Sequence, residues 1–120
     1  MYTYTCRVIA VVDGDTLDIE MDLGFNIKIT ERVRLIGIDT PEVFGSKASP
    51  EGVTASAFTR KWVLDRSTSG KWVYESKRYN ARDKYGRSLG ILSWTSADGK
   101  LVEDLNSALL KSGNAKVLTE

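Results

Sequence analysis

Strand-like patterns of apolar and polar side chains dominate the first third of the chain. Residues 4–12 are rich in β-branched side chains, and residues 17–22 alternate strictly between apolar and polar positions. Residues 23–26 fit a hairpin turn, and residues 27–38 form a third long β-rich run. The pattern predicts a meander of three strands with short connections, in which the 17–22 strand is buried on one face.

The remainder of the chain mixes helical and strand-like patterns. A capping serine, a proline and an acidic residue at 49–51 mark a helix start, which predicts a helix over 50–65. Strands are expected at 71–76 and 89–94, on either side of a polar, basic loop over 77–87. A second amphipathic helix is expected at 101–112, ended by Gly113. The inner face of the first helix is expected to carry Ala55, Phe58, Trp62 and Leu64.

This order of elements predicts the fold class. Five strands with a helix between the third and fourth indicate an α+β, mainly β fold, namely a five-stranded OB-type Greek-key barrel with two to three helices. The length suits one domain over residues 1–120, and we expect a monomer. Because one fold serves many functions, the function has to be inferred from particular side chains.

Composition narrows the chemistry. The chain has no histidine and one cysteine, which excludes a disulfide within the chain, a histidine base and zinc sites built from histidine or several cysteines. A bound metal would have mainly oxygen ligands, which points to Ca²⁺ or Mg²⁺. The net charge of +1 does not by itself predict a nucleic-acid partner.

The N-terminus gives an expectation about location. It lacks the basic stretch, long apolar core and cleavage site of a secretory leader. The longest apolar run, Val8 to Val12, is too short to span a bilayer, so no membrane association is expected. The chain as given is expected to be cytoplasmic, although a processed, secreted form with an added Met1 would look the same.

Three clusters of polar residues are candidates for chemistry. Asp13-Gly14-Asp15-Thr16 is typical of a turn between strands, but one of its carboxylates could point inward as a metal ligand. Residues 39–42 (DTPE) fit a turn or helix start, yet they place two carboxylates three positions apart. They follow Arg34. In a strand, alternate residues share a face, so Arg34 would lie on the same side as Ile36 and Ile38, which is unusual for a solvent-facing arginine.

The third cluster is the loop over 82–87 (RDKYGR). Its default interpretation is a solvated charge run. Alternatively, basic residues around an aromatic ring suit contacts with phosphates and stacking on bases.

Taken together, these motifs resemble the staphylococcal-type nuclease (thermonuclease) family of calcium-dependent nucleases. The resemblance extends from the first strand to Ala115-Lys116-Val117, and five motifs in the same order with matching spacing are a specific signal. The motifs are residues 12–16 (VDGDT), Arg34-Leu35 with residues 39–42 (DTPE), residues 55–59 (ASAFT), residues 83–87 (DKYGR) and residues 97–100 (ADGK).

The resemblance implies a metal site. By motif position, Asp15 and Asp39 are implied as carboxylate ligands of Ca²⁺, and the backbone carbonyl of Thr40 as a third ligand. Asp13 is implied in the outer shell of the metal. On the residue patterns alone, neither Asp15 nor Asp39 looks like a core residue.

The resemblance also implies roles toward a substrate, which would be DNA, RNA or both. Glu42 would orient and deprotonate the attacking water, and Arg34 and Arg87 would hold the scissile phosphate. Lys84 and Tyr85 would bind the neighbouring phosphate on the 3′ side. The family cuts with little sequence preference and leaves 3′-phosphates.

Two other functions remain open at this point. The chain could be an OB-fold module that has lost catalysis and only binds nucleic acid or protein. It could also be a protein-interaction domain with an exposed apolar patch. The joint presence of both aspartates, Glu42 and both arginines favours the enzyme, because burying charged side chains that serve no function costs stability.

Overall fold

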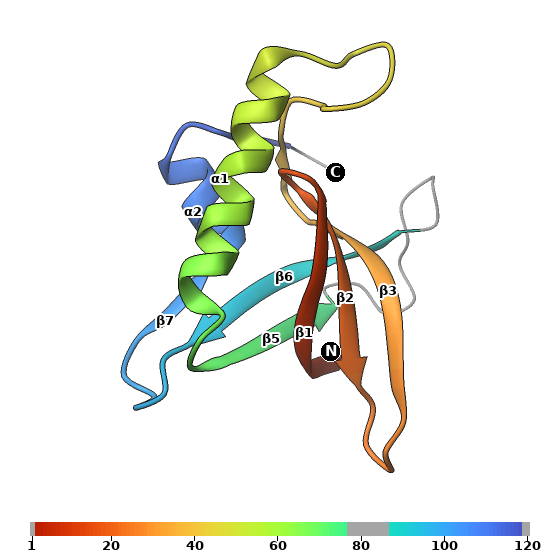
Figure 1. The fold of residues 1–120 in the computed structure, drawn as a ribbon, viewed down its shortest axis with the longest axis vertical. Coiled ribbons are helices and arrows are strands. Elements are labelled where there is room, and N and C mark those ends of the chain that lie inside the picture. Colours follow the sequence, from red (N-terminus) through yellow and green to blue (C-terminus); the bar gives the residue numbers. More distant parts are fainter. Residues whose placement is uncertain (1, 77–86, 119–120) are drawn as a thin grey trace.

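The computed structural model describes residues 2–76 and 87–118. Its main feature is a closed barrel of five strands, in the order β3-β2-β1-β5-β6, which a parallel pairing of β3 with β6 completes (Figure 1). The remaining neighbours in the barrel pair antiparallel. This confirms the predicted OB-type barrel, whose strands are β1 (Tyr2–Asp13), β2 (Thr16–Asp22), β3 (Lys28–Leu35), β5 (Lys71–Ser76) and β6 (Ser88–Thr95).

The first two barrel strands follow the sequence pattern closely. Alternation along β2 buries Leu17, Ile19 and Met21 on one face, as predicted. Between β2 and β3 the chain turns through Phe25 and Asn26, which both have positive φ, and this confirms the predicted hairpin. The β2 residues join the side chains of the other strands and both helices in one apolar core.

The prediction of one strand over 27–38 is wrong. Strand β3 ends at Leu35, and the chain bends at Gly37, whose φ of 80° is a conformation that favours glycine. After the bend a two-residue strand, β4 (Ile38–Asp39), pairs with β8 (Lys116–Val117) and leaves the barrel. The bend also separates Ile38 from the strand face of Arg34, so the predicted alternation does not apply there.

Helix α1 (Pro50–Arg66) starts as predicted, with Ser49 capping the amide of Gly52 and a proline in the first turn. Leu64 was expected on the inner face, but it is 72% exposed. The buried face lies one position away, and its first three turns carry small side chains that allow a close approach to the barrel. Its members are Gly52, Ala55, Ser56, Thr59, Trp62 and Val63.

The second helix is shorter than the predicted 101–112. Residues 102–104 instead form strand β7 (Val102–Asp104), which extends the sheet beside β6. Helix α2 (Leu105–Lys111) starts where the Asp104 side chain caps the amide of Ser107. The helix ends just before Gly113, which has a φ of 79°, as predicted.

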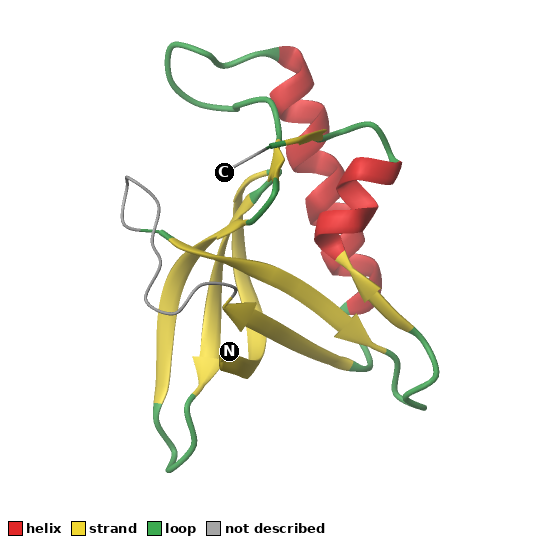
Figure 2. Cartoon of the chain, turned by 180° about the vertical axis from the view of Figure 1, so that it is seen from behind, coloured by secondary structure: helices red, strands yellow, loops and turns green. Residues whose placement is uncertain are grey.

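The two helices lie together on one side of the barrel, as the view from behind shows (Figure 2). In the described part of the chain, neither helix has the length and apolar character needed to cross a membrane. The end of β4, the β1–β2 turn and the start of α1 meet at the same end of the molecule (Figure 1). The candidate chemistry lies there.

Candidate active site

Helix α1 fixes the turn that carries Asp15. The Thr59 hydroxyl donates a 2.7 Å hydrogen bond to the Gly14 carbonyl, and both residues are buried. A β-carbon at Gly14 would lie 3.0 Å from Ala55 and 3.1 Å from Thr40, so glycine is what lets the turn pack this closely. As a result Asp15 is only 5% exposed. The expectation that Asp15 lies outside the core is therefore wrong.

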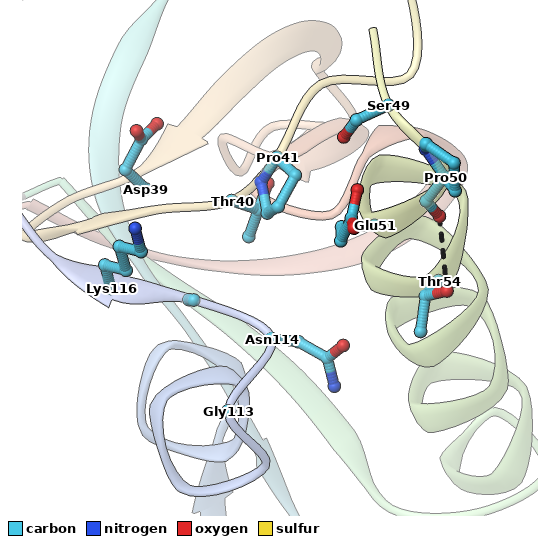
Figure 3. A pocket seen from close by; sticks show the side chains of 11 residues that line it. Asp39, Thr40, Pro41, Ser49, Pro50, Glu51, Thr54, Gly113, Asn114 and Lys116 are labelled. Atoms are coloured by element: carbon cyan, nitrogen blue, oxygen red, sulfur yellow. Dashed lines mark hydrogen bonds between the residues drawn. The ribbon is translucent and has the colours of Figure 1, made fainter.

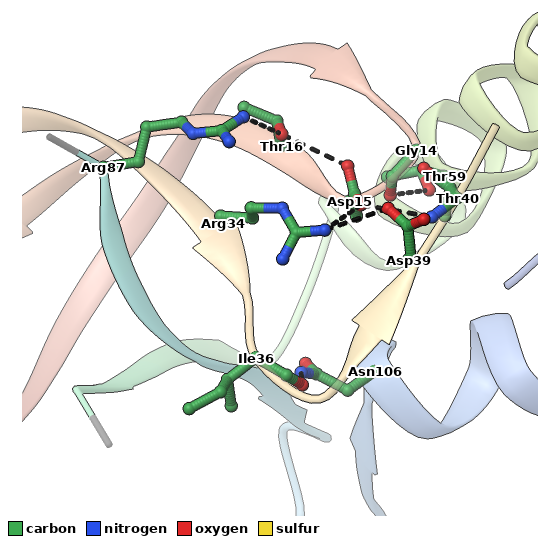
Figure 4. Close-up of polar contacts among 10 residues, drawn as sticks. All are labelled: Gly14, Asp15, Thr16, Arg34, Ile36, Asp39, Thr40, Thr59, Arg87 and Asn106. Carbon is green, nitrogen blue, oxygen red and sulfur yellow. Dashed lines mark hydrogen bonds and ion pairs between the residues drawn. The ribbon is translucent and has the colours of Figure 1, made fainter. Parts of the chain in front are cut away.

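The Asp15 carboxylate accepts hydrogen bonds from three directions. Its Oδ1 accepts from the Thr16 hydroxyl at 3.2 Å, and its Oδ2 accepts from the Thr40 amide at 3.2 Å. Oδ2 also lies 3.3 Å from Nη2 of Arg34, a side chain that is 12% exposed. The same Nη2 contacts Oδ1 of Asp39 at 3.0 Å, so one nitrogen bridges the two carboxylates (Figure 4).

The two carboxylates around Arg34 repel each other. When both are ionised, Asp15 and Asp39 bring two negative charges to the single positive charge of Arg34. Burial raises the pKa of Asp15 above its usual value, and the charge of Asp39 acts in the same direction. The Arg34 guanidinium and the hydrogen bonds from Thr40 and Thr16 oppose the rise without cancelling it. A cation placed between the carboxylates would relieve this repulsion.

The second predicted arginine joins the cluster through Thr16, which belongs to the 12–16 motif but had no predicted role. Arg87 Nη1 donates to the Thr16 hydroxyl at 3.3 Å, and that hydroxyl in turn donates to Asp15. Pairing of β3 with β2 and β6 sets Arg34 beside Thr16 and Leu89, which brings the two arginines to neighbouring strands. Figure 4 shows both guanidinium groups directed toward the Asp15 turn. The sequence signal for Thr16 was its place beside Asp15 in that motif.

Asn106 of α2 is a residue that the sequence did not single out. Its amide nitrogen donates to the carbonyl of Ile36 at 3.0 Å, while its side-chain oxygen accepts from the amide of Leu92 at 3.4 Å. These contacts tie the bend after β3 to β6 and α2 (Figure 4). Because Asp39 lies just after this bend, Asn106 helps to position its carboxylate.

The donor set fits a hard cation better than a transition metal. Asp15 and Asp39 face each other across one nitrogen atom, and Thr40 follows directly in the chain. Among the described residues, no group of three or more His, Cys, Asp or Glu side chains could hold a metal. Backbone carbonyls, waters and substrate oxygens would have to supply the remaining ligands. Ca²⁺, with six to eight oxygen ligands in loose geometry, accepts such a set.

Glu42 and Asp13 are near the cluster in sequence but contact other groups. Within the described segments, no hydrogen bond or ion pair joins the exposed Glu42 side chain to Asp15, Asp39 or Arg34. The Asp13 carboxylate instead accepts from the amide of Val43 at 3.2 Å. Lys84 and Tyr85 lie outside the described residues, so their predicted contact with a phosphate stays a prediction.

A cavity of about 620 Å³ opens beside Asp39 and Thr40. The end of β4, the first turn of α1 and the link between α2 and β8 enclose it (Figure 3). Among the described residues that line it, Lys116, the pairing partner of Asp39, is the only basic one, while Asp39 and Glu51 are acidic. The cavity places open space directly beside the carboxylate cluster.

Comparison with known proteins places the chain in a family. Residues 32–120 match the family model described as staphylococcal nuclease homologue. The chain is 38% identical to the thermonuclease of Staphylococcus intermedius over 108 residues and 32% identical to that of Staphylococcus hyicus over 114 residues. It is also 36% identical to the endonuclease YncB of Bacillus subtilis over 108 residues.

These alignments cover most of this chain but only part of each relative. They include 88%, 93% and 88% of this chain, and 55%, 58% and 44% of the three relatives in the same order. The matched span of the family model contains Arg34, Asp39, Glu42 and Arg87. The chain belongs to the staphylococcal nuclease homologue family.

Proposed function

We propose that this chain is a calcium-dependent nuclease that hydrolyses phosphodiester bonds in DNA, RNA or both. We further propose little sequence preference and 3′-phosphate products. The observation that carries the proposal is the convergence of Asp15 and Asp39 on one arginine, beside a second arginine held through Thr16. Nuclease names among the relatives support the same reaction.

The metal would be held by Asp15, Asp39 and the carbonyl of Thr40. Bound there, Ca²⁺ would supply positive charge to a phosphate oxygen and to the attacking water. Burial and the charge of Asp39 both raise the pKa of Asp15, and this repulsion between two close carboxylates supports a cation between them. With the carboxylates turned to a cation, Arg34 Nη2 would be released from at least one of them and could donate to a phosphate.

The two arginines would bind the scissile phosphate. A guanidinium group presents paired donors that match two phosphate oxygens, and hydrolysis adds negative charge to those oxygens. Donors that are already fixed beside these oxygens lower the activation free energy, because they need no reorganisation during the reaction. Arg34 is held in place on β3 by its ion pairs with Asp15 and Asp39, whereas Arg87 directly precedes β6 and is half-buried.

Glu42 would take a proton from the attacking water. The oxygen of that water bonds to phosphorus, the bond from phosphorus to the 5′ oxygen breaks, and the departing oxygen takes a proton from solvent. A carboxylate suits this role because the chain has no histidine. The side chain is exposed, which leaves it free to reach a water beside a bound phosphate.

Digestion of single- and double-stranded DNA and RNA tests the proposal. We expect cleavage of at least one substrate with Ca²⁺, no cleavage in excess chelator, and products that carry a 3′-phosphate. A parallel series with Mg²⁺ tests the choice of ion. Binding without cleavage under every metal condition would contradict the proposal and favour the catalytically inactive binding module.

A further inference from the structure

The peptide group between Glu42 and Val43 forms a hydrogen bond through each of its two polar atoms. The Glu42 carbonyl accepts from the amide of Ser49 at 3.0 Å, and the next amide, that of Val43, donates to Asp13 at 3.2 Å. These two polar atoms belong to the same planar peptide unit. Their contacts therefore fix the orientation of the backbone immediately after the Glu42 α-carbon.

Helix α1 also packs against this peptide group, through Gly52. A β-carbon at Gly52 would collide with the Glu42 carbonyl oxygen, so only glycine admits the backbone this close to the helix. The bond from the Ser49 amide is part of an isolated bridge between Glu42 and Ala48. The Glu42 carboxylate is thus exposed and forms no hydrogen bond or ion pair with the described residues, while the backbone at Glu42 is fixed by these contacts.

The Asp13 carboxylate has one hydrogen-bond partner, and its charge also helps to raise the pKa of the exposed Arg32 guanidinium. Within the described residues, the contact with Val43 is its only side-chain hydrogen bond, and it makes no ion pair. Asp13 and Asp15 are two residues apart on a turn that α1 holds through Thr59. One turn therefore presents one carboxylate to the metal-binding cluster and the other to the segment that carries Glu42.

We propose that Asp13 is a positioning residue for Glu42, acting through the Val43 amide. This inference rests on the proposed nuclease function and on Glu42 as its base. It requires an acceptor oxygen at position 13 but no negative charge there. The family-based expectation, an outer-shell partner of the metal, requires the charge. The two roles therefore make opposite predictions for Asp13→Asn.

The first test compares Asp13→Asn with Asp13→Ala. The asparagine oxygen can still accept from Val43, so we expect kcat and the Ca²⁺ requirement to stay within about threefold of the wild type, because the hydrogen bond is kept. Alanine leaves the peptide without its acceptor, and we expect kcat to fall by about 10- to 100-fold, as for a misplaced catalytic group, with KM little changed. A loss of Ca²⁺ affinity in Asp13→Asn as large as in Asp13→Ala would overturn the inference.

A control and a double variant isolate the route through Glu42. Asp22 also accepts from a backbone amide, that of Gly24, but at the distant hairpin tip, so Asp22→Ala should leave kcat unchanged. In a Glu42→Gln background, Asp13→Ala should cost almost nothing further, since the base it positions is gone. Additive losses in kcat would overturn the inference.

Amide exchange supplies a readout that does not depend on activity. We expect the Val43 amide to stay protected from exchange in Asp13→Asn and to lose protection in Asp13→Ala, even if the alanine variant is less stable overall. Equal protection in both variants would overturn the inference. An inactive wild type would overturn the proposed function itself, whereas an active wild type with additive losses would overturn only the role of Asp13.

Discussion

Arg87 tests whether the cluster stabilises the transition state or only binds substrate. Its guanidinium reaches the site through Thr16, and it directly precedes β6 and is half-buried. If it donates to oxygens that gain charge as the bond breaks, Arg87→Ala should lower kcat by about 10²–10³. Steady-state kinetics on a defined oligonucleotide would measure this.

A lysine variant separates the effect of the paired guanidinium donors from the effect of the positive charge. Arg87→Lys keeps the positive charge but loses the paired donors, so we expect it not to restore kcat. Should both variants retain normal kcat and change only KM, Arg87 would be a substrate anchor, since an interaction equal in ground and transition states alters binding alone.

Asp15 allows a prediction about stability and pH. Burial raises the pKa of its carboxyl in the folded chain above the usual 3.8, so the folded state holds this proton more tightly than the unfolded state. The contribution of Asp15 to stability is therefore present below pH 3.8 and is lost as the pH rises through the raised pKa. Without metal, Asp15→Asn should lack this loss and be at least as stable as the wild type near neutral pH. Chemical denaturation across pH would show the difference, and a less stable Asp15→Asn at neutral pH would contradict it.

At the scale of single residues, sequence reasoning identified charges more reliably than contacts. The motifs pointed to Asp15, Arg34 and Asp39, and the structure brings these three together. The patterns could not show that Asp15 is buried, because its burial depends on Gly14 fitting against α1. They also gave no sign of the bond from Asp13 to Val43, which joins positions 30 residues apart.

Helix α1 serves as the support for the Asp15 turn, and Thr59 tests that role. Thr59→Val keeps the volume but leaves the buried Gly14 carbonyl without its donor, which should cost about 1–3 kcal/mol of stability. We expect this variant to need more Ca²⁺ for half-maximal activity, because the Asp15 turn is no longer held. Thermal unfolding and Ca²⁺ titration of cleavage would measure both effects.

Two further variants serve as controls for Thr59. Thr59→Ser loses the methyl group but keeps the hydroxyl, so its Ca²⁺ requirement should stay near that of the wild type despite some loss of stability. Thr54→Val makes the same exchange at an exposed site on the same helix, where the hydroxyl donates to the Pro50 carbonyl, and should change little (Figure 3). A normal Ca²⁺ requirement in a folded Thr59→Val would show that the turn holds its shape without this bond.

At the scale of elements, the sequence patterns predicted the strands and helices but not where the path of the chain changes. A β-rich run over 27–38 conceals the bend at Gly37, since Ile36 and Ile38 suit a strand equally well on either side of it. Residues 102–104 suit helix or strand, and pairing with β6 decides for strand. Both differences arise from tertiary contacts that local propensity does not contain.

At the scale of the whole molecule, the near-neutral charge bears on substrate affinity. With a net charge of +1, binding of nucleic acid must depend on a few well-placed cations rather than on a general basic surface. If Lys84 contacts a flanking phosphate, Lys84→Ala should raise KM and reduce the salt dependence of binding to double-stranded DNA by about 0.9 in slope, with less effect on kcat. Lys100→Ala, at the turn between β6 and β7, is a matched control. An unchanged slope in Lys84→Ala would mean that this lysine touches no phosphate.

The whole-molecule topology was predictable because the order of elements fits few closed barrels. The pairing of β3 with β6 that closes the barrel was implied by the OB-type prediction, and it also sets Arg34 next to Thr16 and near Arg87. The site is supported from α1 and α2, through Thr59 and Asn106. Thr59 belongs to the 55–59 motif but had no predicted role, and no sequence pattern marked Asn106.

The Ca²⁺ dependence of cleavage tests the central claim most directly, namely that the carboxylate cluster holds a cation that hydrolysis requires. The measurement is the cleavage rate of a labelled oligonucleotide across Ca²⁺ concentrations for the wild type and for Asp39→Asn, a substitution at a largely exposed side chain. The wild-type rate should vanish in chelator and saturate with Ca²⁺, and the folded variant should need about tenfold more Ca²⁺ or higher, because a charged ligand is lost. A wild type that cleaves at full rate in excess chelator would contradict the claim.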